Sequence, residues 1–355
     1  MSSLSKILLS SLLSFGCIFA SAQDKQDDGP FLRFQATGVQ AQWWCDGQLH
    51  SQSWKQDSQF KVAARCGFSH DITVRQASAN FPVETHFQTK KIAAISDVHG
   101  QYASMKRLLQ ANRIIDSELN WAFGDGHLVI AGDVLDRGEQ VNEALWLLYY
   151  LEAQAEQAGG KVHLLLGNHE FMVIANDLRY VHPKYLKLAD AYNITVSDFY
   201  NEQSVLGRWL RAKPVIIQIN DSLYMHGGIH PHFIALQKSL AEVNELYRSS
   251  FAMSKDELKQ HPQLNFLRGA QGPLWYRGYF NAPQLVQAEL DNLLQQLQVQ
   301  RIIVGHTTLP NVRSHYQGKV ISIDADMKSG KGGEVLMFED GVWWRGDLSG
   351  GRSGL

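Results

Sequence analysis

The sequence predicts an α/β fold with a small β-rich segment before it. Short apolar runs of four or five residues recur along the chain, and glycine and polar residues bound each of them, which is typical of buried strands. Segments with apolar residues at helical spacing separate several of these runs. A hydrophobic content of 45% and a charged content of 19% over 355 residues are typical of an ordered globular protein.

The amino-terminal segment has the three parts of a secretory signal peptide. A weakly basic start at residues 1–6 precedes a short apolar core at 7–19, and the small residues Ala20-Ser21-Ala22 follow. We therefore expect cleavage after Ala22 and export to the periplasm or beyond it. The apolar core is too short to favour a membrane span, and the residues before Cys17 do not suit lipidation, so we expect no stable membrane anchor.

Residues 23–90 are predicted to form a small β-rich extension. Short strands are expected around Trp43-Trp44, at 60–63 and at 72–74. The mature chain keeps two cysteines, Cys45 and Cys66, and an oxidising compartment favours a disulfide that closes a loop of about twenty residues. Two buried free thiols are the alternative. Because the extension has few apolar residues, we expect it to pack against the main domain rather than fold as a separate binding module.

The main domain, predicted over residues 91–350, contains five apolar runs that each stop at a polar block. The runs predict strands at 91–95, 127–131, 162–166, 222–225 and 301–304. Ligands of open α/β sheets bind beyond the carboxyl ends of the strands. We therefore expect one site to be formed by the polar residues that follow these strands, namely Asp97, Asp133, Asn168, His226 and His306.

Helices and further strands are predicted in the rest of the main domain. Residues 139–158 have helical spacing and end at Gly159-Gly160. Residues 171–213 are mixed polar and aromatic, which favours a helical insertion and, as a sharper interpretation, one wall of a cleft. A helix is expected over 283–297, with Pro283 near its start. Additional strands are expected at 215–219, 320–323, 334–338 and 342–344.

The polar blocks supply the ligand types of a two-metal site. Asp97 and His99 are two residues apart, so both can point to the same side near a strand end. Asp133 is the natural bridge, because one carboxylate can bind two cations roughly 3.5–4 Å apart. We assign the first metal to Asp97, His99 and Asp133, and the second to Asp133, Asn168, His226 and His306. These oxygen and nitrogen donors suit Mn, Zn, Fe or Co better than Mg or Ca alone.

Four further residues suit phosphate ester hydrolysis. A carboxylate such as Asp136 would raise the pKa of His169, which could then protonate a leaving alkoxide or phenoxide. Arg137 can bind phosphate oxygens through two nitrogens. Arg277 is a second candidate for the phosphate, and a structural salt bridge is its alternative role.

Each block alone has a simpler explanation. An Asp-x-His pair occurs often by chance, Gly-Asn-His-Glu is also typical of a helix N-terminus, and a lone histidine is often buried and bonded to backbone. Their joint occurrence favours a site. The presence of Asp133, His169 and Arg137 also argues against a non-catalytic binding module.

The four blocks at 96–100, 132–138, 167–170 and 305–307 resemble the metallophosphoesterase superfamily. With His-Gly-Gly at 226–228 and Gly-His-Thr at 305–307, they resemble its phosphoprotein-phosphatase branch. The stretch Gly-Pro-Leu-Trp-Tyr-Arg-Gly at 272–278 is similar to that of the Shewanella-like protein phosphatases, and the resemblance covers about residues 91–345. Ser96 stands where this family usually has glycine.

The resemblance implies a central β-sandwich flanked by helices and two divalent metal ions. It implies that a metal-bound water or hydroxide attacks phosphorus directly, that Asp136 pairs with His169, and that Arg137 binds phosphate. It also implies phosphorylated protein or peptide substrates with a preference for phosphotyrosine. A phosphodiesterase or dinucleoside polyphosphate hydrolase on the same metals is the alternative. The net charge of -2 gives no basic surface for nucleic acid, and the sequence makes no prediction of the oligomeric state.

Overall fold

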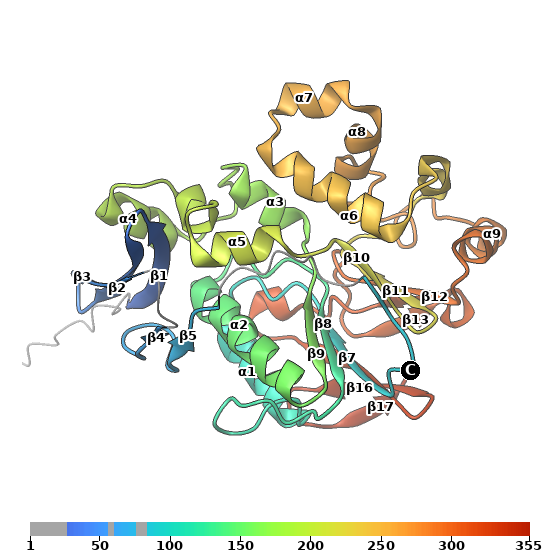
Figure 1. The fold of residues 1–355 in the computed structure, drawn as a ribbon. Coiled ribbons are helices and arrows are strands. Elements are labelled where there is room, and N and C mark those ends of the chain that lie inside the picture. The colour runs from blue at the N-terminus through green and yellow to red at the C-terminus, as the bar shows by residue number, and fades with distance from the viewer. Residues whose placement is uncertain (1–26, 56–59, 76–83) are drawn as a thin grey trace, which may run out of the picture.

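The computed structural model describes residues 27–55, 60–75 and 84–355 (Figure 1). The predicted signal peptide, residues 1–22, lies outside the described residues. Within the described ranges, no helix is both long enough and apolar enough to span a membrane.

Two six-stranded sheets form the centre of the main domain. The first has the strand order β17-β16-β15-β7-β8-β9, and the second has the order β13-β14-β12-β11-β10-β6. The first contains β7 (Lys91–Ile95), β8 (His127–Ile130), β9 (Lys161–Leu164), β15 (Glu334–Glu339), β16 (Val342–Asp347) and β17 (Arg352–Gly354). The second contains β6 (Thr85–His86), β10 (Ile216–Ile219), β11 (Ser222–Met225), β12 (Arg301–Val304), β13 (Arg313–His315) and β14 (Val320–Ser322).

The two faces of each sheet belong to different apolar cores. Ile92 and Ala94 of β7 share a buried cluster with Ile303 of β12 in the second sheet. Their neighbour Ile95 belongs instead to the larger cluster that includes Leu148 of the helical layer. Successive strand residues point to opposite faces, so this alternation places one core between the sheets and the other beneath the helices. The predicted α/β fold, with a central β-sandwich flanked by helices, is confirmed.

Nine α-helices occur in the described chain. They are α1 (Tyr102–Ala111), α2 (Val141–Gln157), α3 (Asn168–Ile174), α4 (Pro183–Tyr192), α5 (Val205–Arg211), α6 (Leu240–Ser249), α7 (Lys255–Gln260), α8 (Pro262–Arg268) and α9 (Gln287–Leu297). Short 3-10 helices are η1 (Val196–Tyr200), η2 (Pro231–Leu236), η3 (Ser250–Ala252), η4 (Tyr316–Gly318) and η5 (Met327–Ser329). The segment at 171–213 is helical as expected. α9 starts four residues after Pro283, later than the expected start of this helix. Glu289 accepts the backbone N–H of Val286 and so caps the helix at that point.

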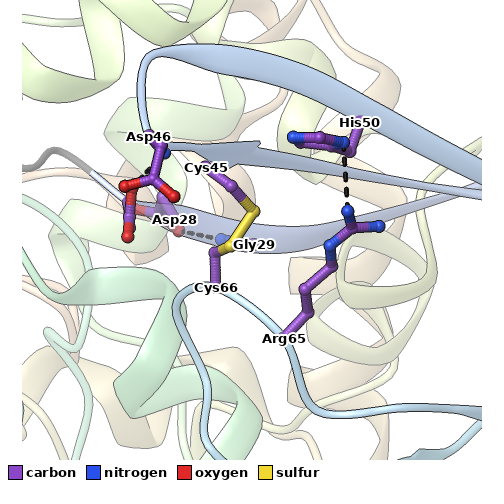
Figure 2. The surroundings of a disulfide bond; sticks show 8 residues. Asp28, Gly29, Cys45, Asp46, His50, Arg65 and Cys66 are labelled. Carbon is purple, nitrogen blue, oxygen red and sulfur yellow. Dashed lines mark hydrogen bonds between the residues drawn. A yellow bond between two sulfur atoms is a disulfide. The ribbon is translucent and has the colours of Figure 1, made fainter.

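The extension forms an antiparallel sheet of β1 (Asp28–Gln35), β2 (Gly38–Cys45) and β3 (Gln48–Lys55), followed by the small pair β4 (Lys61–Val62) and β5 (Ile72–Thr73). A disulfide joins Cys45 to Cys66, 21 residues further on, and so ties β2 to the loop after β4 (Figure 2). The extension contacts the main domain, where the Trp146 indole donates to the Pro30 carbonyl at 2.9 Å. The boundary at residue 90 stays a prediction, and β6 before it pairs with β10 of the second sheet.

Parallel pairing brings the functional segments to one edge. β7, β8 and β9 are adjacent and parallel, and β11 and β12 are adjacent and parallel in the other sheet. Their carboxyl ends therefore deliver the five polar blocks to the same region of the sandwich.

Candidate active site

Four of the predicted ligands meet at the imidazole of His226. Its Nε2 lies 3.0 Å from Asp133 Oδ2, 3.0 Å from Asn168 Oδ1 and 3.1 Å from His306 Nδ1. All four side chains are buried. Asp133, His226 and His306 are close enough together to hold one cation.

The remaining predicted ligands lie on the other side of Asp133. His99 Nε2 is 3.6 Å from Asp133 Oδ2 and 3.8 Å from Asp97 Oδ1. Because the same Asp133 oxygen also contacts His226, Asp133 lies between the two groups. The second group that could hold a cation consists of His99, Asp133 and His169, so geometry alone also permits His169 as a ligand.

The backbone at this site is held in an unusual conformation. Side-chain-bearing residues rarely adopt positive φ, and such strain clusters at functional sites. Six predicted site residues have φ between 46° and 70°: Asp97, His99, Asp133, Asp136, Arg137 and His306. Strained turns follow the strands where ligands must point inward.

Glu170 stabilises the turns after β8 and β9, a role that the sequence analysis did not assign. Its buried carboxylate accepts the backbone N–H groups of Asp133, Val134, Leu135 and Gly167 at 2.7–3.0 Å. The contact to Gly167 also caps α3, so the Gly-Asn-His-Glu block is both a helix N-terminus and part of the site. The sequence signal for this role was the position of Glu170 three residues after Gly167, which is the spacing of a helix cap.

Glycine is required where Asp133 approaches α3. A Cβ at Gly167 would lie 2.2 Å from Asp133 Oδ1. Ser96, in contrast, is compatible with the site, because its hydroxyl lies 2.5 Å from Asp97 Oδ2 and 3.1 Å from the Ala131 carbonyl. The serine thus contacts a predicted ligand directly.

Backbone carbonyls orient two of the imidazoles. His99 Nδ1 lies 2.8 Å from the Leu135 carbonyl, and His226 Nδ1 lies 2.8 Å from the Ala131 carbonyl. A carbonyl oxygen only accepts hydrogen bonds, so each Nδ1 carries a proton and each Nε2 is the nitrogen that faces the cluster.

The charges of the site fit bound cations. No Lys or Arg nitrogen of the described residues lies within 4 Å of the Asp97 or Asp133 carboxylate, and His306 Nε2 is buried without a partner. Burial lowers the pKa of His99 to about 3 and that of His306 to about 2, which leaves both rings neutral, the form that binds metals. Burial and the charge of Asp324 raise the pKa of Asp97 to about 7. Asp324, also missed from the sequence, adds negative charge to the site.

His169 and Asp136 form the predicted pair. His169 Nδ1 lies 2.5 Å from Asp136 Oδ2, and both side chains are buried. Burial opposes protonation of His169, but the hydrogen bond to Asp136 and the charges of Asp133, Asp136 and Glu170 together raise the pKa of His169. Asp136 therefore fixes the orientation of the His169 ring, and the Nε2 atom of this ring faces the ligand cluster.

Arg137 lies beside His99 at the edge of the cluster, and its guanidinium packs against an aromatic ring. Its Nε donates to His99 Nε2 at 3.3 Å, and its guanidinium carbon lies 4.9 Å from the centre of the Tyr180 ring. The Arg137 N–H also bonds to the Tyr180 carbonyl at 2.8 Å. Tyr180 is 42% exposed and its ring centre is 5.2 Å from that of His169, so the helical segment at 171–213 does supply a wall beside the site.

Arg277 reaches the site from the loop before α9. Its Nη1 donates to the His306 carbonyl at 2.6 Å and to Thr307 Oγ1 at 3.3 Å. No carboxylate among the described residues lies within 4 Å of its guanidinium, so the structure does not show the alternative salt bridge. Arg277 therefore lies beside the predicted ligand His306, and its positive charge is available to bind an anion.

Comparisons with known proteins give the family of this chain. The calcineurin-like phosphoesterase family matches residues 90–310. The crystal structure of a cold-active protein-tyrosine phosphatase from a psychrophilic Shewanella species superposes with a TM-score of 0.88 and 43% identity, covering 93% of this chain and 99% of that one.

Two curated relatives agree. An uncharacterised protein of Schizosaccharomyces pombe is 30% identical over 253 residues, 68% of this chain and 75% of its own length. Shewanella-like protein phosphatase 1 of Plasmodium berghei is 28% identical over 246 residues, 67% of each chain. The resemblance noted in the sequence and the prediction of a metal-dependent protein phosphatase are confirmed. The chain belongs to the calcineurin-like phosphoesterase family and is similar, within it, to the Shewanella-like protein phosphatases.

Proposed function

We propose that this protein hydrolyses phosphate monoesters on proteins or peptides at a binuclear metal centre. The ligands would be Asp97, His99, Asp133, Asn168, His226 and His306. The observation that carries the proposal is the position of Asp133, whose Oδ2 lies 3.0 Å from His226 on one side and 3.6 Å from His99 on the other. Two divalent cations at these groups would polarise the phosphate and lower the pKa of the attacking water.

The remaining side chains act on the phosphate and the leaving group. Arg137 neutralises phosphate oxygens at the mouth of the site, and Arg277 does so from the side of His306. His169 Nε2 donates its proton to the leaving oxygen, while Asp136 holds the ring and stabilises its charged form. Burial of these groups strengthens each interaction because little water screens them.

We further propose phosphotyrosine as the preferred substrate. The half-exposed Tyr180 ring beside His169 and Arg137 offers an apolar surface for an aryl leaving group. The structural relative from Shewanella, 43% identical, is a protein-tyrosine phosphatase by name.

Hydrolysis assays on a set of phosphate esters test this function. The metal-stripped protein, reloaded with Mn, Zn or Fe, is given phosphotyrosyl and phosphoseryl peptides, a phosphodiester and a dinucleoside tetraphosphate. We expect metal-dependent release of phosphate from the monoesters, fastest from phosphotyrosine. Equal kcat/KM for the two peptides would remove the tyrosine claim, and faster cleavage of the diester or tetraphosphate would replace the proposed function.

We also propose export, with cleavage after Ala22 leaving a mature chain of extension and main domain. The Cys45–Cys66 disulfide supports an oxidising compartment. Amino-terminal sequencing of the protein recovered from the periplasm checks this, and a start at Gln23 is expected. A start at Met1 in the cytoplasmic fraction would contradict it.

A further inference from the structure

A positively charged cavity adjoins the site beyond Arg277. It has a volume of about 870 Å³ and is lined by residues of the loop before α9, by the end of α8 and by His230. Arg277 lines this cavity and also donates to the His306 carbonyl. Trp275 lines it too, and its ring centre lies 5.6 Å from that of His306. The cavity therefore continues from the predicted second metal group.

Arg268 is the residue of this cavity that the proposed chemistry does not use. Its Nη1 donates to Ser250 Oγ at 2.8 Å, and its guanidinium carbon lies 4.1 Å from the centre of the Phe171 ring. No carboxylate among the described residues lies within 4 Å of it, and the cavity lining there contains no Asp or Glu. Arg268 is half-buried, and a charge that is partly removed from water without an opposite charge beside it favours an anionic partner.

The cavity also suits a short peptide segment in size and in its walls. Trp275 and Tyr276 supply aromatic surface, and the Tyr276 ring packs edge-on against the His230 ring at 5.4 Å. A volume of several hundred cubic ångströms is typical of sites that hold a drug-sized ligand, which is comparable in size to a few peptide residues. With Arg268 and Arg277 both in its lining, the cavity selects for negative charge.

We infer that this cavity is a specificity subsite for an anionic side chain next to the phosphorylated residue of a peptide substrate. The inference rests on the proposed phosphatase function and deepens it. Arg268 binds the anion at the far side of the cavity, while the phosphate lies at the metal ligands. The preferred substrate is then a phosphopeptide with a nearby Glu, Asp or second phosphate.

Steady-state kinetics on matched phosphotyrosyl peptides test the subsite. The peptides differ only in the residues that flank phosphotyrosine, which are Glu, Gln, Lys or a second phosphoresidue, and p-nitrophenyl phosphate serves as a substrate without flanks. The enzyme variant is Arg268→Met, which removes the charge but keeps an apolar stem over Phe171. Arg208→Met is its control, because Arg208 also stacks on a ring, Phe34, and bonds to a carbonyl, but does not line the cavity.

We expect the unmodified protein to favour the Glu peptide over the Gln peptide about tenfold in kcat/KM, since a hydrogen bond to a charged group contributes at that level. Arg268→Met should remove this preference through KM and leave p-nitrophenyl phosphate turnover unchanged, whereas Arg208→Met should keep the preference.

Faster cleavage of the doubly phosphorylated peptide than of the Glu peptide would identify phosphate as the anion. Equal kcat/KM for Glu and Gln peptides, or an equal loss on p-nitrophenyl phosphate in Arg268→Met, would overturn the subsite while the phosphatase stands. No hydrolysis of any ester by the unmodified protein would overturn the proposed function itself.

Discussion

Two buried clusters of acidic groups in the described part of the chain differ in how their charge is balanced. The first joins the extension to α2 and α4, where Asp28 Oδ2 lies 2.5 Å from Lys184 Nζ and Glu143 Oε1 lies 4.0 Å from the same atom. Asn142 donates to Asp28 at 2.8 Å, and the Gly29 N–H donates to it at 2.7 Å (Figure 2). This cluster contains its own cation.

The second cluster is the candidate active site, where no lysine or arginine nitrogen of the described residues lies within 4 Å of the Asp97 or Asp133 carboxylate. Asp97 and Asp133 are joined there by three imidazoles and an amide. Although burial opposes protonation, the charges of Asp133 and Asp97 raise the pKa of His226 to about 10. The cluster therefore attracts positive charge strongly, and divalent cations would provide it.

This difference in charge balance distinguishes a structural cluster from a functional site. A buried acid with a lysine partner stabilises one arrangement of the chain and is complete when the chain folds. Buried acids and imidazoles without such a partner form a site that requires an external cation. Four predictions test this distinction, beginning with the largest expected effect.

Asp133→Asn should abolish both metal binding and turnover. The substitution preserves the shape of the side chain but removes the charge shared by the two groups. Loss of partners that only orient ligands already lowers affinity or activity about 10- to 100-fold, so loss of the shared ligand should exceed about 100-fold in kcat. Elemental analysis and phosphopeptide kinetics measure this. Asp291→Asn is the control, because the Asp291 carboxylate pairs with Lys319 and not with the predicted ligands. Metal content equal to that of the unmodified protein in Asp133→Asn would refute the bridge.

His169→Ala should lower kcat about 10²- to 10⁴-fold while metal content stays the same. A proton donor matters most for a poor leaving group, so the loss should be larger with phenyl phosphate than with p-nitrophenyl phosphate. Rates and bound metal are measured on the same preparations. If the metal were lost with the activity, His169 would be a ligand, as the geometry around Asp133 also permits.

Lys184→Met should destabilise the fold by about 3–5 kcal/mol, because Asp28 and Glu143 would stay buried without their cation. Denaturant unfolding of the metal-loaded protein gives the free energy. Adding Asp28→Asn to this variant should recover part of the loss. A change below about 1 kcal/mol in the single variant would show that the pair contributes little.

The free energy of unfolding should also fall as pH rises from about 5 to 8, through Glu143. Burial and the charge of Asp28 raise the pKa of Glu143 to about 8 from its ordinary 4.5. Between these values the folded chain retains a proton that the unfolded chain has released, so stability decreases with pH by at most about 1.4 kcal/mol per unit. The difference between the unmodified protein and Glu143→Gln, unfolded in urea at several pH values, isolates this group. A constant difference across the range would contradict the assignment.

Much of the candidate site could be predicted from the sequence because its signals are local. Each ligand directly follows an apolar run, and parallel strands bring such ends to one edge. Asp136 and Arg137 belong to the same block as Asp133, so their proximity is set by a single turn. The pairing of His169 with Asp136 joins two different blocks, and the family resemblance implied it.

The rest depends on contacts between distant parts of the chain. Lys184 meets Asp28 only because the extension packs against α4, and neither residue belongs to a motif. Asp324 follows β14 with no pattern around it, yet it raises the pKa of Asp97. No sequence pattern marks Arg268 either, because an arginine without an acidic partner can be recognised only once its surroundings are known.

The measurement that tests the central claim most directly is anomalous X-ray diffraction from crystals of the manganese-loaded protein, recorded on both sides of the manganese absorption edge. We predict two anomalous peaks that flank the Asp133 carboxylate, one beside His99 and Asp97 and the other beside Asn168, His226 and His306. A single peak, or none at Asp133 in active protein, would contradict a binuclear centre built on this cluster.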